Sequence, residues 1–166
     1  MRELGIQYAI GASHWRVDVH FSEASSYELD ESIRDWHRQQ LWLAEDDRVT
    51  ILGHPWDNFR ELWFDDFSII PRSMKIELGA ALKQYGKCAE CNPGFFLRGS
   101  EKFHYQYAEY MRELFEMGIP IVYGSDAHTP NDKLRLYRES SDKYLAYAGF
   151  ADGEISDLPV SKLWLK

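Results

Sequence analysis

The sequence predicts an α/β fold built on a parallel sheet, and three observations support this expectation. Short apolar runs typical of buried strands alternate along the chain with segments whose apolar residues recur at helical spacing. Such alternation is typical of right-handed βαβ units, in which parallel strands are joined by helices. No linker, repeat or low-complexity stretch interrupts the pattern, so we expect a single domain over residues 1–166.

Four apolar runs are the predicted strands of this sheet. They cover residues 7–12, 49–53, 87–91 and 119–123. The last run is preceded by Gly118 and contains Pro120 at its start, which are residue types that punctuate secondary structure. Weak alternation of apolar and polar residues over 155–165 predicts at most one short additional strand.

The segments between the strands carry apolar stripes at the spacing of an α-helix. The first three stripes are Leu29–Ile33–Trp36–Leu41, Met74–Leu78–Leu82–Tyr85 and Phe103–Tyr107–Met111–Leu114. Ser25 or Ser26 is available to cap the first helix, and Gly86 and Gly118 are natural stops for the second and third. A fourth helix is expected over residues 133–148.

Length and composition limit the classes of protein to which this chain can belong. A chain of 166 residues can bury one sizeable core, and an aromatic content of 15% is enough to fill it. The net charge of −8 and the lack of a basic cluster argue against a nucleic-acid partner. No apolar run has the length of a membrane span and the first residues do not resemble a signal peptide, so we expect a cytoplasmic protein.

Polar side chains that bind metals follow several predicted strands. Asp126 and His128 follow the fourth strand and, if the backbone stays extended, point to the same side. His14 follows the first strand and His54 the second, while Glu90 lies near the end of the third on the same rim. Because the carboxyl ends of parallel strands share one rim, we expect a site for Zn, Mn or Fe there, with Glu90 able to hydrogen-bond a ligand.

Other candidates have simpler explanations. Cys88 and Cys91 form one Cys-x-x-Cys motif, which could be half of a zinc knuckle or a redox pair. On a strand, residues three apart face opposite sides, so we expect two buried small apolar side chains instead. We expect His37 to lie at the surface or in an interface, and His104 to pack within an aromatic helix. Asn92 is expected to shape a turn with Pro93 and Gly94.

The stretch of residues 89–130 resembles the carboxyl half of the PHP (polymerase and histidinol phosphatase) family, closest to its histidinol-phosphatase branch. It contains Ala-Glu-Cys-Asn-Pro-Gly at 89–94, then Leu97-Arg98, then a helical segment, and then residues 118–130 with Gly-Ser-Asp-Ala-His. Upstream, residues 10–15 are similar to the family's Gly-Ser-x-His segment and residues 51–55 to its Gly-His-Pro segment. The resemblance covers nearly the whole chain, and Gly-Ser-Asp-Ala-His is its most specific part.

The resemblance implies a distorted (β/α)7 PHP-type barrel with parallel strands and a cage of divalent metal ions (Zn, Mn or Fe) at the strand ends. In such a site a metal-activated water attacks a phosphate monoester. By position, His14 and His54 match ligands of one metal, Asp126 a ligand of a second and His128 a ligand of a third. Arg98 matches a basic residue that can pair with the substrate phosphate.

The chain departs from the family at its amino-terminal side. Family members open with a His-x-His motif, which this sequence lacks, and a full barrel takes roughly 200 to 250 residues. We therefore expect a partial barrel whose N-terminal strands are missing, with weaker metal binding than a complete member has. Open sheet edges favour a homo-oligomer or a separate partner chain that supplies the amino-terminal part.

These observations leave three hypotheses for function. The first is a metal-dependent phosphoesterase, similar to histidinol phosphatase and acting on a small phosphorylated substrate, with an incomplete metal cage. The alternative is a non-catalytic PHP remnant that serves as a metal-binding or assembly module. A weaker third interpretation is a generic α/β domain whose histidines are incidental.

Overall fold

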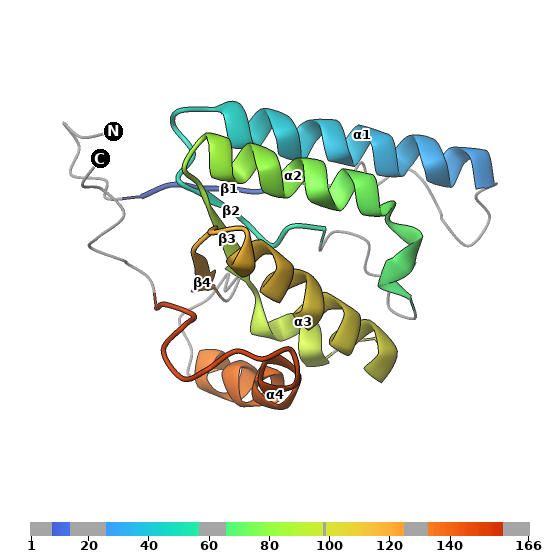
Figure 1. Cartoon of the computed structure of the whole chain (residues 1–166). Coiled ribbons are helices and arrows are strands. Elements are labelled where there is room, and N and C mark those ends of the chain that lie inside the picture. The colour runs from blue at the N-terminus through green and yellow to red at the C-terminus, as the bar shows by residue number, and fades with distance from the viewer. Residues whose placement is uncertain (1–7, 14–25, 57–65, 98, 125–132, 158–166) are drawn as a thin grey trace.

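The computed structural model describes residues 8–13, 26–56, 66–97, 99–124 and 133–157. Its elements in chain order are β1 (Ile10–Gly11), α1 (Ser26–Glu45), β2 (Ile51–Leu52), η3 (Phe67–Ile69), α2 (Arg72–Gln84), β3 (Cys88–Cys91), η4 (Pro93–Leu97), α3 (Glu101–Glu116), β4 (Ile121–Tyr123) and α4 (Lys133–Tyr147). Strands and helices alternate as predicted, and α1 and α2 lie side by side (Figure 1). The two 3₁₀ turns, η3 and η4, were not predicted.

The four strands form one sheet in the order β1-β2-β3-β4, and every neighbouring pair is parallel. Ile10 is paired with Ile51, Leu52 with Ala89, and the register continues from β3 to β4. The strands are shorter than the apolar runs suggested. Of the expected final strand, the described residues contain a single bridge between Ser156 and Val122. A closed barrel is not seen in the part of the chain that the structure describes.

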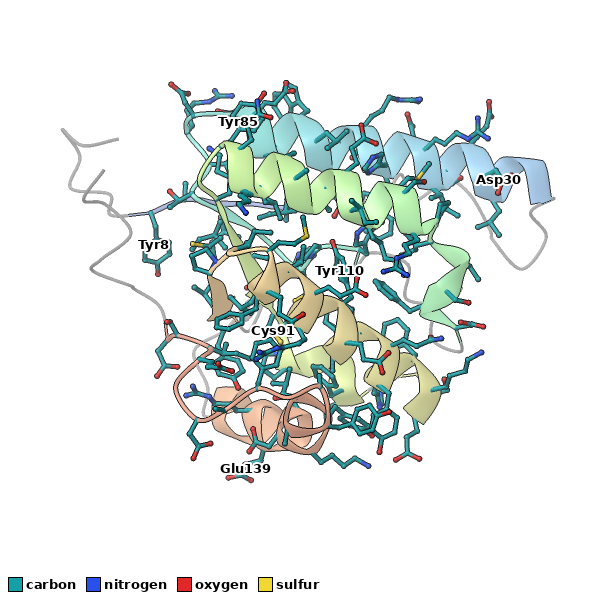
Figure 2. The ribbon with its side chains drawn as sticks, in the orientation of Figure 1. Tyr8, Asp30, Tyr85, Cys91, Tyr110 and Glu139 are labelled. Carbon is teal, nitrogen blue, oxygen red and sulfur yellow. The ribbon has the colours of Figure 1, made fainter. Side chains whose placement is uncertain are left out.

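The two faces of the sheet have different surroundings. Ala89 and Cys91 on β3 belong to the main core, on the side covered by helices. Cys88, one residue earlier than Ala89, belongs to a small second cluster with Ile51 and Val122. The two thiols are free, buried and on opposite faces, as expected for small apolar residues on a strand. Figure 2 shows Cys91 among the side chains around α3.

Aromatic side chains fill the main core between the sheet and α3. The ring of Phe67 in η3 makes edge-to-face contacts with Phe103 and Tyr107 of α3, at centroid separations of 5.9 and 5.6 Å. The ring centroid of Phe95 in η4 lies 4.6 Å from that of Tyr107. Such geometries are preferred because the edge of one ring is attracted to the face of another. His104 also packs here against Phe96 and Tyr144, which confirms its predicted role.

Helix ends follow the predicted signals. Gly86 and Gly118 follow the caps of α2 and α3 with φ of 64° and 90°, a left-handed conformation that favours glycine. The hydroxyl of Ser100 caps α3 by accepting a hydrogen bond from the Phe103 amide at 3.2 Å. Among the described residues no helix is long and apolar enough to cross a membrane.

Candidate functional site

The predicted site residues fall mostly outside the described part of the chain. His54 is described, whereas four others lie outside the described residues: His14, Arg98, Asp126 and His128. Ser13 and Gly124, which immediately precede His14 and the 125–132 segment, lie past the carboxyl ends of β1 and β4. His54 lies past the same end of β2, so these three positions share one rim of the sheet.

His54 occupies a strained turn after β2. Its backbone φ is 28° and that of Trp56 is 64°, both in the left-handed region that costs a non-glycine residue about 1–3 kcal/mol each. The residue is 6% exposed, and its backbone amide donates a hydrogen bond of 2.8 Å to Oε2 of Glu90. Gly53, just before it, donates at 2.8 Å to the carbonyl oxygen of Gly11 on β1. The structure therefore holds this turn against β1 and β3 despite its strain.

Trp56 anchors the other end of the turn. The residue is fully buried, and its amide donates to Oε1 of Gln40 on α1 at 3.1 Å. Its indole Nε1 donates to the hydroxyl of Tyr110 on α3 at 3.3 Å. The Trp36 ring contacts it edge-on at 5.7 Å. Figure 2 places Tyr110 in the interior, near α2 and α3. Packing and hydrogen bonds from two helices thus fix the left-handed conformation of Trp56.

His37 corrects one prediction. We expected it at the surface or in an interface, but it is buried beneath the turn and stacks on Trp56 with 5.6 Å between ring centroids. Its Nε2 donates to Oε2 of Glu77 on α2 at 3.0 Å. The expectation failed because α2 lies against this face of α1, a contact that helical spacing in α1 alone does not reveal.

Glu90 connects the ends of two neighbouring strands. It is 3% exposed and lies on the rim, as predicted, where its carboxylate accepts the His54 amide. The same side chain lies over Gly124, because a Cβ added to this glycine would overlap the carboxylate and come within 2.7 Å of Cγ. Burial, and to a smaller extent the charge of Glu90, raise the pKa of the neighbouring Cys91 thiol. Glu90 thus contacts two of the three rim positions, His54 and Gly124.

The chain turns directly after β3, at residues 92–94. Asn92 was predicted to form the turn with Pro93 and Gly94, and its Oδ1 accepts the Gly94 amide at 2.9 Å. This contact is an Asx turn, in which a side chain replaces a backbone acceptor. It confirms the prediction and starts η4, which leads toward Arg98.

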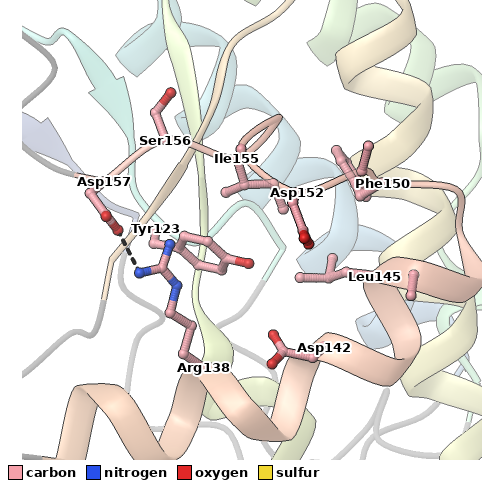
Figure 3. A pocket seen from close by; sticks show the side chains of 12 residues that line it. Tyr123, Arg138, Asp142, Leu145, Phe150, Asp152, Ile155, Ser156 and Asp157 are labelled. Carbon is pink, nitrogen blue, oxygen red and sulfur yellow. Dashed lines mark ion pairs between the residues drawn. The ribbon is translucent and has the colours of Figure 1, made fainter.

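A cavity of about 580 Å³ lies beyond β4, between α4 and the segment that follows it (Figure 3). The Arg138 guanidinium lies 4.1 Å from the Tyr123 ring and pairs with Asp157 at 2.9 Å. Asp142 and Asp152 also line this cavity, so acidic groups outnumber the single arginine. This balance of charge does not suit a phosphate. The cavity was not predicted, because its residues carry no shared motif and come together only on folding.

The described residues do not contain a complete metal site. No group of three or more His, Cys, Asp and Glu side chains among them could hold a metal ion. The predicted ligand set is therefore represented by His54 alone, with Glu90 beside its backbone. The positions of the other predicted ligands, and of Arg98, stay predictions.

Comparison with known proteins identifies the fold. No family model matches the sequence and no curated protein matches it. Among solved structures, the chain matches a histidinol phosphate phosphatase from Lactococcus lactis subsp. lactis, crystallised with zinc, L-histidinol and phosphate. The match has a TM-score of 0.57 and 18% sequence identity, covering 87% of this chain and 57% of the phosphatase. The chain therefore resembles part of a PHP-family domain in its fold, as the sequence motifs predicted.

Proposed function

We propose that this chain is part of a metal-dependent phosphoesterase that hydrolyses a small phosphate monoester, as the histidinol phosphatase branch of the PHP family does. One observation carries the proposal. The fold matches a histidinol phosphate phosphatase, and His54 lies at the strand rim that also carries Gly124, directly before the Ser-Asp-Ala-His segment. The rim of a parallel α/β sheet is where such folds place their sites.

The donor atoms suit a divalent metal ion. In this proposal His14, His54, Asp126 and His128 hold the metal, which is Zn, Mn or Fe because imidazoles with one carboxylate suit all three. His54 would bind through a neutral ring nitrogen, and its buried, strained turn restricts the positions its ring can take. The bound ion would supply Lewis-acid activation of water and of a phosphate oxygen.

The chain's own residues would bind and orient the substrate. Arg98, next to the end of η4, would pair with the phosphate through its planar guanidinium fork. The cavity around Arg138 is an unsuitable phosphate site, because Asp157 already pairs with that guanidinium and two further aspartates line it. The substrate is therefore expected at the strand rim rather than beyond β4.

A non-catalytic role is the second candidate, and two features of the sequence support it. The chain contains no His-x-His motif, and it spans 57% of the length of the phosphatase it matches. A separate amino-terminal chain would supply the remaining ligands in the first proposal. In the second, the chain binds metal or assembles with a partner without hydrolysis.

The first test is the metal content of the purified chain by elemental analysis, together with His54→Ala and the control His104→Asn. His104 is a buried imidazole that packs against Phe96 and Tyr144 and is not a predicted ligand, so it controls for loss of a histidine. We expect near-stoichiometric Zn, Mn or Fe in the parent and the control, and a strong loss in His54→Ala. Phosphate release from histidinol phosphate then separates the enzyme from the non-catalytic module. Metal content that His54→Ala leaves unchanged would reject the phosphoesterase and the metal-binding module at this rim, and would leave only an assembly role that does not use the rim.

A further inference from the structure

We propose that Glu90 is a positioning residue for the rim: it fixes His54 through the backbone and sets the path of the chain at Gly124, where the Ser-Asp-Ala-His segment begins. The part of this inference that concerns metal affinity rests on the proposed function. The part that concerns the conformation of His54 does not, because it follows from contacts within the described residues.

The first contact is a charge-assisted hydrogen bond. The His54 amide donates to Oε2 of Glu90 at 2.8 Å, and Glu90 is 3% exposed. A bond from an amide to a carboxylate is roughly twice as strong as one to a neutral acceptor, and burial limits competition from water. This contact is made to the backbone of His54, so it fixes the turn without using the imidazole ring.

The second observation is the strain of the residue that Glu90 holds. His54 has φ of 28°, and Trp56, two residues on, has φ of 64°. Such conformations persist only where the surroundings impose them, and they concentrate at functional sites. The Glu90 carboxylate on β3 accepts the amide of the first of these residues, and the Gln40 side chain on α1 accepts the amide of the second. The turn is therefore clamped at both ends by buried side-chain acceptors.

The third observation is the space that the neighbouring strands leave for the carboxylate. On the β4 side, Gly124 has no Cβ where the carboxylate lies, and any Cβ there would overlap it. A Cβ on Gly53 of the β2 side would instead meet Ile10 and Ala12, so that glycine makes room for β1. Gly124 is thus the glycine that leaves space for the buried glutamate at the rim. An apolar side chain could fill this space at a lower desolvation cost, so packing alone does not explain a carboxylate here.

The fourth observation is the face on which Glu90 lies. Cys88, two residues before it, belongs to the small cluster on the side opposite the main core, and side chains two apart on a strand share a face. Val122, two residues before Gly124, belongs to the same cluster. Glu90 is therefore at the carboxyl end of the sheet, on the face opposite the main core. In a complete barrel this face would line the interior, where a side chain can organise a site.

The experiment compares Glu90→Gln and Glu90→Ala with the control Glu154→Gln. Glu154 is a matched control because its carboxylate also accepts a loop amide, that of Ala151 at 2.9 Å, in the segment after α4. The first readout is the amide proton and ring resonances of His54 by NMR in the metal-free chain. The second is zinc affinity, measured by competition with a chromophoric chelator, and the absorption spectrum of the Co(II) form. Thermal unfolding reports whether each variant is folded.

We expect Glu90→Ala to shift the His54 amide proton upfield, to move its ring resonances and to weaken zinc binding about 10-fold or more. Glu90→Gln keeps an oxygen that can accept the amide, so it should retain most of the His54 geometry and lie between the parent and Glu90→Ala. Glu154→Gln should match the parent in both readouts.

Unchanged His54 resonances in a folded Glu90→Ala variant would overturn the inference. Zinc binding that depends on His54 but stays equal in all Glu90 variants would overturn its metal-affinity part, while the proposed function stands. If the parent binds no zinc, the proposed function fails, and the shift of the His54 resonances still decides whether Glu90 holds the turn.

Discussion

Replacing Gly124 with alanine tests most directly how the rim is built. The added Cβ would overlap the Glu90 carboxylate and lie 2.7 Å from its Cγ, so the glutamate must leave its position. Forcing an extra methyl group into a packed site costs about 1–3 kcal/mol. Loss of the charge-assisted bond from the His54 amide costs about 1.5–3 kcal/mol more. Together these predict a fall of about 4 kcal/mol in the free energy of unfolding.

Urea unfolding followed by tryptophan fluorescence measures this change. A loss of about 4 kcal/mol is a large part of the 5–15 kcal/mol that is usual for a domain. It corresponds to a lowering of Tm by about 12 °C for a chain of this size. The control is Gly94→Ala, where the new Cβ would meet a single close atom, the Asn92 Oδ1 at 3.0 Å. We expect that control to cost about 1 kcal/mol.

The double variant Gly124→Ala with Glu90→Ala decides whether the overlap is the cause. Once the glutamate is shortened, the new methyl group has room, so the double variant should be more stable than the sum of the single effects by about 2 kcal/mol or more. Additive losses, within about 0.5 kcal/mol, would refute the placement of the Glu90 carboxylate over Gly124.

Three further predictions concern other buried or paired groups. Tyr110→Phe removes the acceptor of the buried Trp56 indole and should cost about 1–3 kcal/mol by urea unfolding, and an unchanged midpoint would contradict that bond. Burial raises the pKa of Cys88 to about 11 and also raises that of Cys91, so a thiol reagent at pH 8 should modify both only after unfolding, and rapid labelling of the folded chain would disprove this burial. The hydrogen bond from the Lys102 ammonium, followed by those from Ser68 and Gln106, lowers the pKa of Asp66 below its ordinary 3.8. The stability it contributes is present above that value and is lost as pH falls through its lower folded pKa. Asp66→Asn should therefore flatten the fall of Tm on acidification below pH 4, and an unchanged slope would argue against these bonds.

The order of elements could be predicted because each depends on local pattern. The stripe that contains Phe103 and Tyr107 indicated α3, and Gly86 and Gly118 marked the ends of two helices through their conformational freedom. Parallel pairing could be predicted from the alternation of strands and helices, because each crossover helix returns the chain to the end of the sheet where the previous strand began. Strand lengths were overestimated: the apolar run at 49–53 forms only the two-residue strand β2, since the pattern reports burial and not the extent of pairing.

The site could be predicted by residue type but not by geometry. The position of His54 after an apolar run indicated the rim, and Glu90 was expected on the same side. Nothing local indicates that His37 stacks beneath Trp56 or that Gln40 accepts its amide, because those contacts join α1 to a turn after β2. Side-chain periodicity reports which face of a helix is buried, and it does not report what lies against that face.

The distribution of buried polar groups separates the turn at His54 from the rest of the core. Around Phe67 and Tyr107 the core is almost wholly aromatic and aliphatic, which is sufficient for stability. Around the turn, a carboxylate from β3 and an amide from α1 each accept one backbone N–H, and both are buried. Burying a polar group costs desolvation free energy, and a buried polar group fixes one conformation only when all its hydrogen bonds are made. Two such groups meet at one strained turn. The conformation of this turn is therefore under stronger constraint than the packing of the aromatic core. A remnant that kept only the fold would have no need of that constraint, because apolar packing would hold the strands equally well. The arrangement therefore favours a chain in which the position of His54 still matters, and the metal and NMR measurements ask that question of the same residue by independent means.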